Sequence, residues 1–225
     1  GQRVSRSLVK LLQAGGVSFA ILGTEESCTC ESARRLGNEY LFQSATETNV
    51  ELLKGYEVKK IVTNCPHCLN TLKNEYPDFG GGFEVVHGTE LVAHLVASGK
   101  LKLEQAVEVD LTYHDPCYLS RYNGQVDAPR AILGAIPGVK LTEMEKHGEA
   151  TMCCGAGGGR FWLEEHLGKR VNHARFEQAL ETKASCVAVS CPFCNVMLGN
   201  AAGETGHEQV GTQDVLELAA KALKA

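Results

Sequence analysis

The chain has 225 residues, of which 44% are hydrophobic and 22% are charged, and its formal net charge at pH 7 is −5. This composition supports a folded core and excludes a disordered or collagen-like chain, and the negative charge without a basic tract argues against nucleic acid as a partner. Ten cysteines are unusual but too sparse for a small disulfide scaffold, and no stretch approaches the ~18–20 apolar residues of a membrane-spanning helix.

Apolar runs of strand length alternate with amphipathic stretches of helix length. The chain begins with a helix-like pattern, whose apolar face holds Leu8, Val9, Leu11 and Leu12. In chain order, the later residues predict a strand at 17–22, a helix at 33–53, strands at 60–64 and 84–86, a helix at 90–97, a strand at 107–114, a helix at 129–136, a strand at 139–142, a helix at 161–180, a strand at 186–190 and a helix at 214–223. This alternation indicates parallel sheets with crossover helices.

The chain also contains an internal repeat. A shift of 126 residues places Cys65-Pro66-His67-Cys68 on Cys191-Pro192-Phe193-Cys194 and Cys28 on Cys154, and residues 88–91 resemble residues 211–214. We therefore predict an α/β fold of two pseudo-repeated Rossmann-like units with mainly parallel sheets, at residues 1–103 and 104–225. The first unit is expected to be incomplete, because the position equivalent to Cys117 falls before residue 1.

The second unit contains a regular cysteine pattern, which we call the second cysteine set. Its members are Cys117, Cys153, Cys154, Cys191 and Cys194. The Cys-Pro-x-Cys word is expected where a strand ends and a helix begins, because proline suits the first helical position and a helix N-terminus favours a thiolate. The glycines at 155 and 157–159 would let backbone N–H groups approach a bulky metal cluster. Structural zinc and a cubane iron–sulfur cluster each take four ligands, whereas this set offers five.

These motifs resemble the cysteine-rich CCG-domain family, whose members include the heterodisulfide reductase-like iron–sulfur oxidoreductases. The resemblance rests on Tyr113-His114-Asp115-Pro116-Cys117-Tyr118-Leu119, on Cys153-Cys154-Gly155-Ala156-Gly157-Gly158-Gly159-Arg160 and on both Cys-Pro-x-Cys words, and it covers essentially the whole chain. Within this family, the motifs are most similar to those in the C-terminal module of electron-transfer flavoprotein:quinone oxidoreductase-type iron–sulfur proteins. The resemblance implies a [4Fe-4S] cluster, cubane or non-cubane, on the second cysteine set.

The same resemblance implies the function and the partners. It implies an electron-transfer module of an oxidoreductase that works between a flavin or flavoprotein partner and a quinone-linked or disulfide acceptor. Other iron–sulfur subunits or domains of a larger redox complex are further expected partners, with membrane contact only through parts outside this chain. We expect a cytoplasmic location, at the cytoplasmic face of the membrane where such a complex is membrane-bound, since paired cysteines suit a reducing compartment.

The first unit departs from the family pattern. The adjacent cysteine pair is replaced by Cys28-Thr29-Cys30, so the first cysteine set consists of Cys28, Cys30, Cys65 and Cys68. Four thiols suit a cubane [4Fe-4S] cluster or a zinc ion better than a five-cysteine cluster.

Two other functions remain open. The chain is alternatively a cluster-based catalytic subunit of a heterodisulfide reductase, or a zinc-stapled structural domain. A thioredoxin-like dithiol would explain one Cys-Pro-x-Cys word but not Cys117 or the pair at 153–154. Cys186 is expected to be a buried structural cysteine, and His114 either tunes a cluster or is a structural histidine at a strand end.

Overall fold

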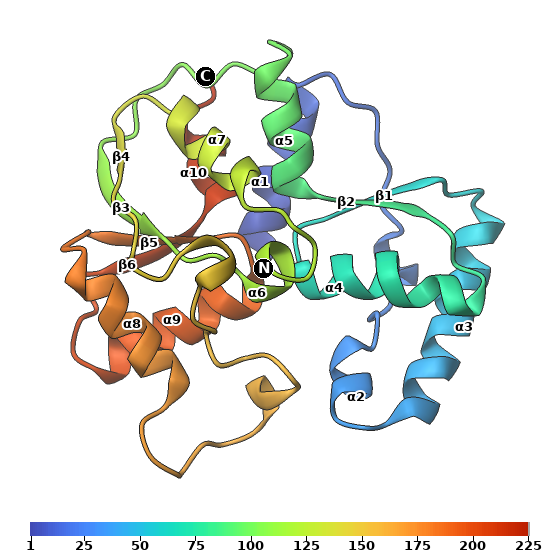
Figure 1. The fold of residues 1–225 in the computed structure, drawn as a ribbon. Coiled ribbons are helices and arrows are strands. Elements are labelled where there is room, and N and C mark those ends of the chain that lie inside the picture. Colours follow the sequence, from blue (N-terminus) through green and yellow to red (C-terminus); the bar gives the residue numbers. More distant parts are fainter. Residues whose placement is uncertain (225) are drawn as a thin grey trace.

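The computed structural model describes residues 1–224 and contains two parallel sheets with helices on both sides (Figure 1). A two-stranded sheet has the order β1-β2, and a four-stranded sheet has the order β4-β3-β5-β6. The strands are β1 (Lys60–Thr63), β2 (Glu84–His87), β3 (Val109–Tyr113), β4 (Val139–Leu141), β5 (Cys186–Val189) and β6 (Gly211–Asp214). The expected α/β class with parallel sheets is confirmed.

Helices connect these strands. The α-helices are α1 (Gln2–Ala14), α2 (Glu31–Arg35), α3 (Glu39–Gly55), α4 (Pro66–Asn70), α5 (Gly88–Ala97), α6 (Cys117–Ser120), α7 (Asp127–Ala135), α8 (Val171–Glu181), α9 (Pro192–Glu204) and α10 (Val215–Lys221). A π-helical turn at Thr71–Glu75 and a 3₁₀ turn at Tyr76–Phe79 extend α4. Further 3₁₀ turns lie at Gly23–Glu25, Gly148–Ala150 and Arg160–Trp162. No helix within residues 1–224 combines the length and hydropathy needed to cross a membrane.

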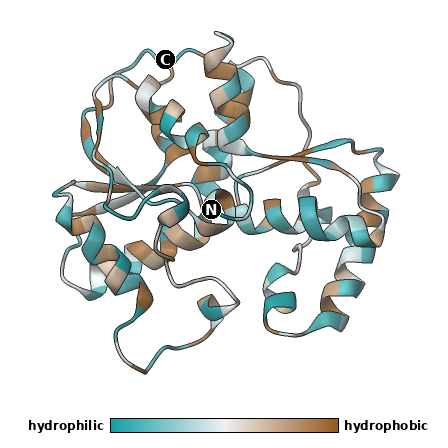
Figure 2. Ribbon diagram, viewed as in Figure 1, coloured by the Kyte–Doolittle hydropathy of each residue, from teal (hydrophilic) through white to brown (hydrophobic). Residues whose placement is uncertain are grey.

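Helices from both halves of the chain share one hydrophobic core. α1 packs on α10, and α5 packs on α7, in the upper part of the view of Figure 1. Leu11 and Val92 therefore belong to the same buried cluster as Leu111, Leu133 and Val215. Figure 2 shows hydrophobic residues on the strands and on the helices that cover them. The strands of the two-stranded sheet all precede residue 103 and those of the four-stranded sheet all follow it, and the two halves share a common interior. The division into units 1–103 and 104–225 stays a prediction.

The strand predicted at 17–22 is wrong. This segment is irregular, with Phe19 39% and Ile21 77% exposed. In the second half of the chain, the segment that corresponds to residues 17–22 is β4, which follows α7 and pairs in parallel with β3. Among residues 1–224 no strand lies beside residues 17–22 in the way that β3 lies beside β4, so the apolar run has no backbone partner that would hold it as a strand.

The long helix predicted at 161–180 is also wrong in its first half. Only Val171–Glu181 is α-helical, and it follows a 3₁₀ turn and an irregular segment. Gly168 adopts a left-handed conformation with φ +68°, which a continuous right-handed helix does not allow. The Glu165 carboxylate accepts a hydrogen bond from the Val171 backbone N–H at 3.4 Å, so it satisfies a donor at the start of α8 from outside the helix.

Strand β6 was not among the expected elements, because Gly-Thr-Gln-Asp has no apolar run. The predicted match between residues 88–91 and 211–214 is wrong, because residues 88–91 begin helix α5 whereas residues 211–214 form strand β6. The element equivalent to β6 is β2, since the last residue of each of these strands caps the next helix. The His87 ring accepts a hydrogen bond from Thr89 N, and the Asp214 carboxylate accepts one from Leu216 N at 2.9 Å.

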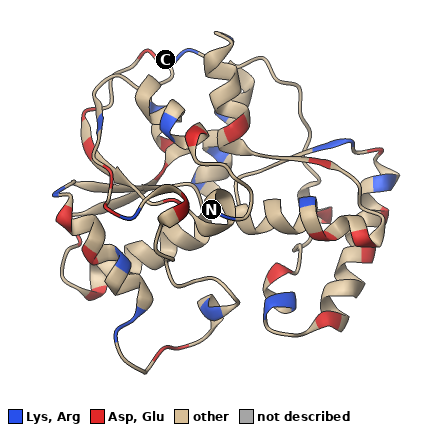
Figure 3. Cartoon of the chain, in the orientation of Figure 1, with Lys and Arg blue, Asp and Glu red and all other residues tan. Residues whose placement is uncertain are grey.

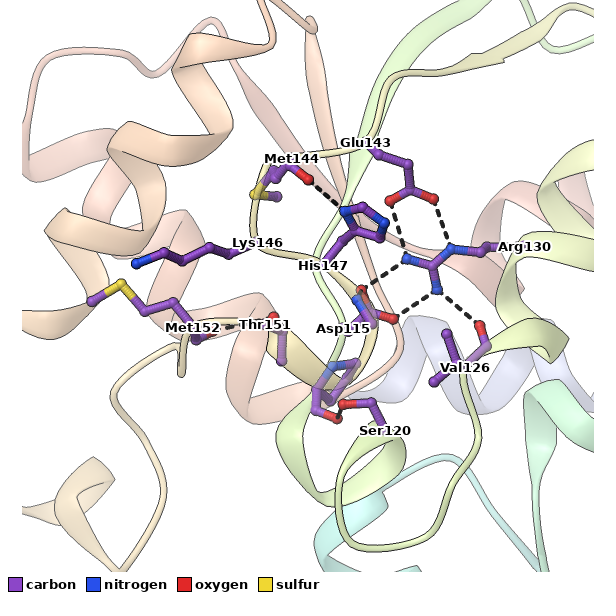
Figure 4. Close-up of polar contacts among 12 residues, drawn as sticks. Asp115, Ser120, Val126, Arg130, Glu143, Met144, Lys146, His147, Thr151 and Met152 are labelled. Carbon is purple, nitrogen blue, oxygen red and sulfur yellow. Dashed lines mark hydrogen bonds and ion pairs between the residues drawn. The ribbon is translucent and has the colours of Figure 1, made fainter.

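A buried ion pair fixes the turn between β3 and α6 (Figure 4). The Asp115 carboxylate is 1% exposed and accepts hydrogen bonds from Arg130 of α7 at 2.7 and 2.9 Å and from Gly148 N at 2.7 Å. Arg130 also pairs with Glu143 at 2.7 and 3.0 Å. These contacts hold the segment before Cys117 against the loop that leads to Cys153.

We expect Leu11→Ala to lower the free energy of unfolding by about 2–5 kcal/mol, since Leu11 is fully buried in the shared core. Urea denaturation measures this change. Leu167→Ala, at a side chain that is 89% exposed, serves as the control and should change stability by no more than about 0.5 kcal/mol. Equal stability of the two variants would mean that α1 is not part of the core.

We expect Arg130→Met to cost about 3–5 kcal/mol, because it leaves the buried Asp115 carboxylate without its cation. Lys140→Met is the matched control, since Lys140 forms an exposed pair with Asp110 at 3.6 Å. That control should stay within about 0.5 kcal/mol of the unmodified chain in the same denaturation experiment. A cost for Arg130→Met no larger than the control's would show that the buried pair does not hold the turn.

Candidate metal centre

The second cysteine set gathers at the carboxyl ends of two neighbouring parallel strands. β3 leads through residues 114–116 into α6, whose first residue is Cys117, and β5 leads through Ser190 to Cys191, the N-cap of α9. Because β3 and β5 pair directly, their ends meet at one edge of the sheet, where α/β proteins bind ligands. Cys154, Cys191 and Cys194 are buried, whereas Cys117 and Cys153 are partly exposed.

The thiols of this set contact one another. The Sγ atoms of Cys154 and Cys194 are 3.3 Å apart, and Cys117 contacts Cys153. Gly155 N donates to Cys153 Sγ at 3.3 Å. The pKa of Cys153 is lowered strongly by hydrogen bonds from the Cys117 and Cys154 thiols and then from the amides of Gly155 and Gly157. Gly157 lies close to this sulfur, since a Cβ at position 157 would be in van der Waals contact with Cys153 Sγ at 3.8 Å.

Cys191 is a second thiolate position. Burial opposes its ionisation, but hydrogen bonds from the Cys194 and Cys65 thiols and from the Cys194 and Phe193 amides lower its pKa well below the usual range. The amides belong to the N-terminus of α9, which stabilises negative charge. A cluster of thiols with two sites that favour thiolate matches the donor set that a metal requires, since thiolates are the ligands.

The two cysteine sets meet at their Cys-Pro-x-Cys words. The Cys65 thiol, at the N-cap of α4, contacts the Cys191 thiol, and this contact raises the Cys65 pKa. The third residues of the two Cys-Pro-x-Cys motifs, His67 and Phe193, are also in contact, and their ring centroids are 4.7 Å apart. The helices that carry these cysteines, α4, α6 and α9, are nearly free of charged residues (Figure 3).

The first cysteine set is less converged. Cys28 is exposed and accepts a hydrogen bond from Cys30 N at 3.3 Å, and Cys30 adopts a left-handed conformation with φ 57°. Thr29 Oγ1 donates to Cys68 Sγ at 3.6 Å, which links the 28–30 segment to α4. Within residues 1–224, the group of three potential ligand atoms that lie within 4.8 Å of one another is His114, Cys154 and Cys194, and it does not include the first set.

A cavity of about 470 Å³ opens beside Cys117 between the two halves of the chain. Arg35 and Glu75 line one side, and Tyr118, Arg121 and Gly157 line the other. The rings of Tyr118 and Tyr122 stack there with centroids 4.7 Å apart. A ligand of the second set thus borders space that solvent or another molecule can enter.

Two buried groups support the second set without belonging to the cysteine pattern. His114 is 1% exposed, and burial followed by the charge of Arg175 lowers its pKa to about 3, so the ring is neutral. Arg175 of α8 is fully buried. The sequence pointed to His114 by its place at a strand end, but Arg175 carried no signal, because arginine on an amphipathic helix is usually on the exposed face.

Cys186 lies in β5, is buried, and contributes to the shared core rather than to either set, as expected for a structural cysteine. None of the ten cysteines, all of them within residues 1–224, forms a disulfide.

The chain is similar in sequence to proteins with curated names. It is 50% identical over 223 residues to "Probable iron-sulfur-binding oxidoreductase FadF" of Bacillus subtilis and 46% identical over 231 residues to "EtfAB:quinone oxidoreductase" of Syntrophomonas wolfei, in each case over 99% of this chain and 32% of the relative. It is 38% identical over 225 residues to a dihydromethanophenazine:CoB–CoM heterodisulfide reductase subunit of Methanosarcina barkeri, over 97% of this chain and 54% of that protein. The chain thus spans about a third of the first two relatives. The sequence pattern of the CCG cysteine-rich domain matches residues 1–73 and 111–199, so the chain belongs to the CCG cysteine-rich domain family.

Proposed function

We propose that this chain is an iron–sulfur electron-transfer module of a larger oxidoreductase. The observation that carries the proposal is the convergence of Cys117, Cys153, Cys154, Cys191 and Cys194 at the carboxyl ends of β3 and β5. The names of the relatives, an iron-sulfur-binding oxidoreductase and a quinone oxidoreductase among them, support the same function.

The second cysteine set is proposed to hold a [4Fe-4S] cluster of the non-cubane type, because it offers one thiol more than a cubane needs. When bound, the cluster would accept and release one electron at a time. The amides of Gly155 and Gly157 would donate hydrogen bonds to its sulfur ligands, and the buried Cys154, Cys191 and Cys194 would keep one side of it away from water. Both effects set the potential of such a cluster.

The partly exposed Cys117 is the proposed side of electron entry or exit. It borders the 470 Å³ cavity, and neighbouring Tyr118 and Tyr122 provide an aromatic surface there. A redox partner that docks at this cavity would approach the cluster more closely than from any side where the ligand is buried.

The first cysteine set is proposed to bind a [4Fe-4S] cubane or a zinc ion. The Thr29 contact to Cys68 and the Cys65 contact to Cys191 hold its two halves near each other and near the second set. An iron–sulfur cluster here would be a second redox centre for electron transfer, whereas zinc would only join residues 28–30 to α4.

The proposed partners are an electron-transfer flavoprotein or related flavoprotein, other iron–sulfur domains and a quinone-linked acceptor. We further propose a cytoplasmic location, with membrane association through other parts of a complex, because closely spaced cysteines that act as metal ligands suit a reducing compartment.

A second candidate is catalysis of disulfide reduction. The cavity borders Cys117 of the second cysteine set, and one relative is named as part of a heterodisulfide reductase. Turnover of a heterodisulfide by the iron-loaded chain with a reduced dye as electron donor would favour this candidate. An intact cluster without turnover would leave electron transfer, and zinc without iron would leave a structural domain.

We expect Cys194→Ala to lose the iron and sulfide bound by the second set when the chain is purified without oxygen, because Cys194 lies at its buried centre. Cys186→Ala is the matched control, since Cys186 is equally buried but outside the set, and it should retain both. Iron and sulfide analysis with EPR of the reduced protein measures the outcome. Iron and sulfide contents of Cys194→Ala equal to those of the unmodified chain, or equal losses in both variants, would contradict the proposed site.

Cys68→Ala should remove the metal of the first set and leave the EPR signal of the second. Cys68 contacts Thr29 and Cys65, both in the first half of the chain, so the change is aimed at the first set. Iron and zinc analysis of this variant against the unmodified chain identifies which metal is lost. Unchanged contents of both metals would show that the first set binds neither.

A further inference from the structure

His114 and Arg175 form a buried pair beside the second cysteine set. Arg175 Nε lies 3.0 Å from His114 Nδ1. A guanidinium N–H can only donate, so Nδ1 must be the accepting, unprotonated nitrogen of the ring. A neutral imidazole then has its proton on Nε2. The Arg175 contact therefore decides which face of the ring carries a hydrogen-bond donor.

That donor has no protein partner within the described residues. Nε2 of His114 is buried and makes no hydrogen bond, and a nitrogen of this ring lies within 4.8 Å of both the Cys154 and the Cys194 sulfur. A buried N–H without an acceptor is unfavourable. Because Arg175 occupies Nδ1, Nε2 is the ring nitrogen left to donate, and the neighbouring sulfurs are the acceptors we assign to it once they are anionic.

The charge of Arg175 is similarly uncompensated. Its remaining donors go to neutral acceptors, namely Lys146 O at 3.0 Å, Gln178 Oε1 at 2.7 Å and Thr151 Oγ1 at 3.2 Å. In residues 1–224 no carboxylate forms an ion pair with it, and the nearby Asp115 is already paired with Arg130. A fully buried cation needs an anion, and thiolates that bind a metal supply negative charge within this site.

We propose that His114 donates an Nε2–H···S hydrogen bond to the metal–thiolate group of the second cysteine set, and that Arg175 fixes the ring in that tautomer and provides the counter-charge. The inference rests on the proposed iron–sulfur function. Reduction adds one negative charge to the group, so a hydrogen bond and a buried cation stabilise the reduced state more than the oxidised state. Together they raise the reduction potential. Direct ligation by His114 Nε2 would require its lone pair, and hence a proton on Nδ1, where Arg175 already donates.

The first test uses the unmodified protein. In the reduced, iron-loaded chain with ¹⁵N-histidine, pulsed EPR is expected to show one weakly coupled histidine nitrogen and a coupled proton that exchanges in D₂O. Both signals should persist in His67→Leu, which removes the histidine nearest the first set. A strong nitrogen coupling, as for a metal ligand, or no histidine coupling would overturn the inference.

The second test uses the reduction potential. We expect His114→Leu to lower the ratio of reduced to oxidised cluster at a fixed ambient potential by about tenfold, which equals about 59 mV for one electron. His114→Gln, which keeps an N–H donor, should recover part of that shift, and Arg175→Gln should shift the potential in the same direction. His87→Leu is the control, because it removes another fully buried histidine away from the second set.

The outcomes separate the two proposals. Unmodified protein without iron would contradict the proposed function. Iron-loaded protein in which His114→Leu has the potential of the His87→Leu control would contradict only the role of His114. If the His114 variants do not retain a cluster, the pulsed EPR of the unmodified protein decides the question.

Discussion

The structure depends on a contact between two helix N-termini. α4 and α9 each begin with a proline after a capping cysteine, and the thiols of Cys65 and Cys191 meet where the two helices start. Each N-terminus carries partial positive charge from its unpaired amides, so two of them brought together repel unless negative charge lies between them. The Cys191 thiolate at this junction relieves that repulsion. The same arrangement that makes the site suitable for a metal therefore also stabilises the packing of the two halves when Cys191 is ionised.

The shared core explains why this junction can be held in place. α1 packs on α10 and α5 on α7, so the interior continues from one sheet to the other without a break. The Asp115–Arg130 pair adds a polar tie between the turn before Cys117 and the loop that leads to Cys153. Side chains with little chemistry of their own thus set the positions of the reactive thiols, as pre-organised metal sites require.

The sequence predicted those parts of the site that are encoded by a few consecutive residues. The Cys-Pro-x-Cys words mark a strand end and a helix start by local chemistry, and the structure places them there. The paired sheets followed from the alternation of apolar runs. The strand predicted at 17–22 was wrong because a strand is stabilised by its neighbour, and no apolar pattern shows whether a neighbour exists. Arg175 and Arg130 could not be predicted, since their partners His114 and Asp115 lie on other elements and arginine is usually exposed. Which cysteines share a metal also depends on distances that sequence spacing does not contain.

The contact of Cys65 with Cys191 has a consequence for the chain without its metal. Cys191 favours the thiolate, and the thiolate is the species that attacks when a disulfide forms. Oxygen would convert this contact of the emptied site into a cross-link between the two halves of the chain. Such a bridge would occupy the ligands and block reassembly, so damage in air would be trapped kinetically even where the intact protein is thermodynamically stable.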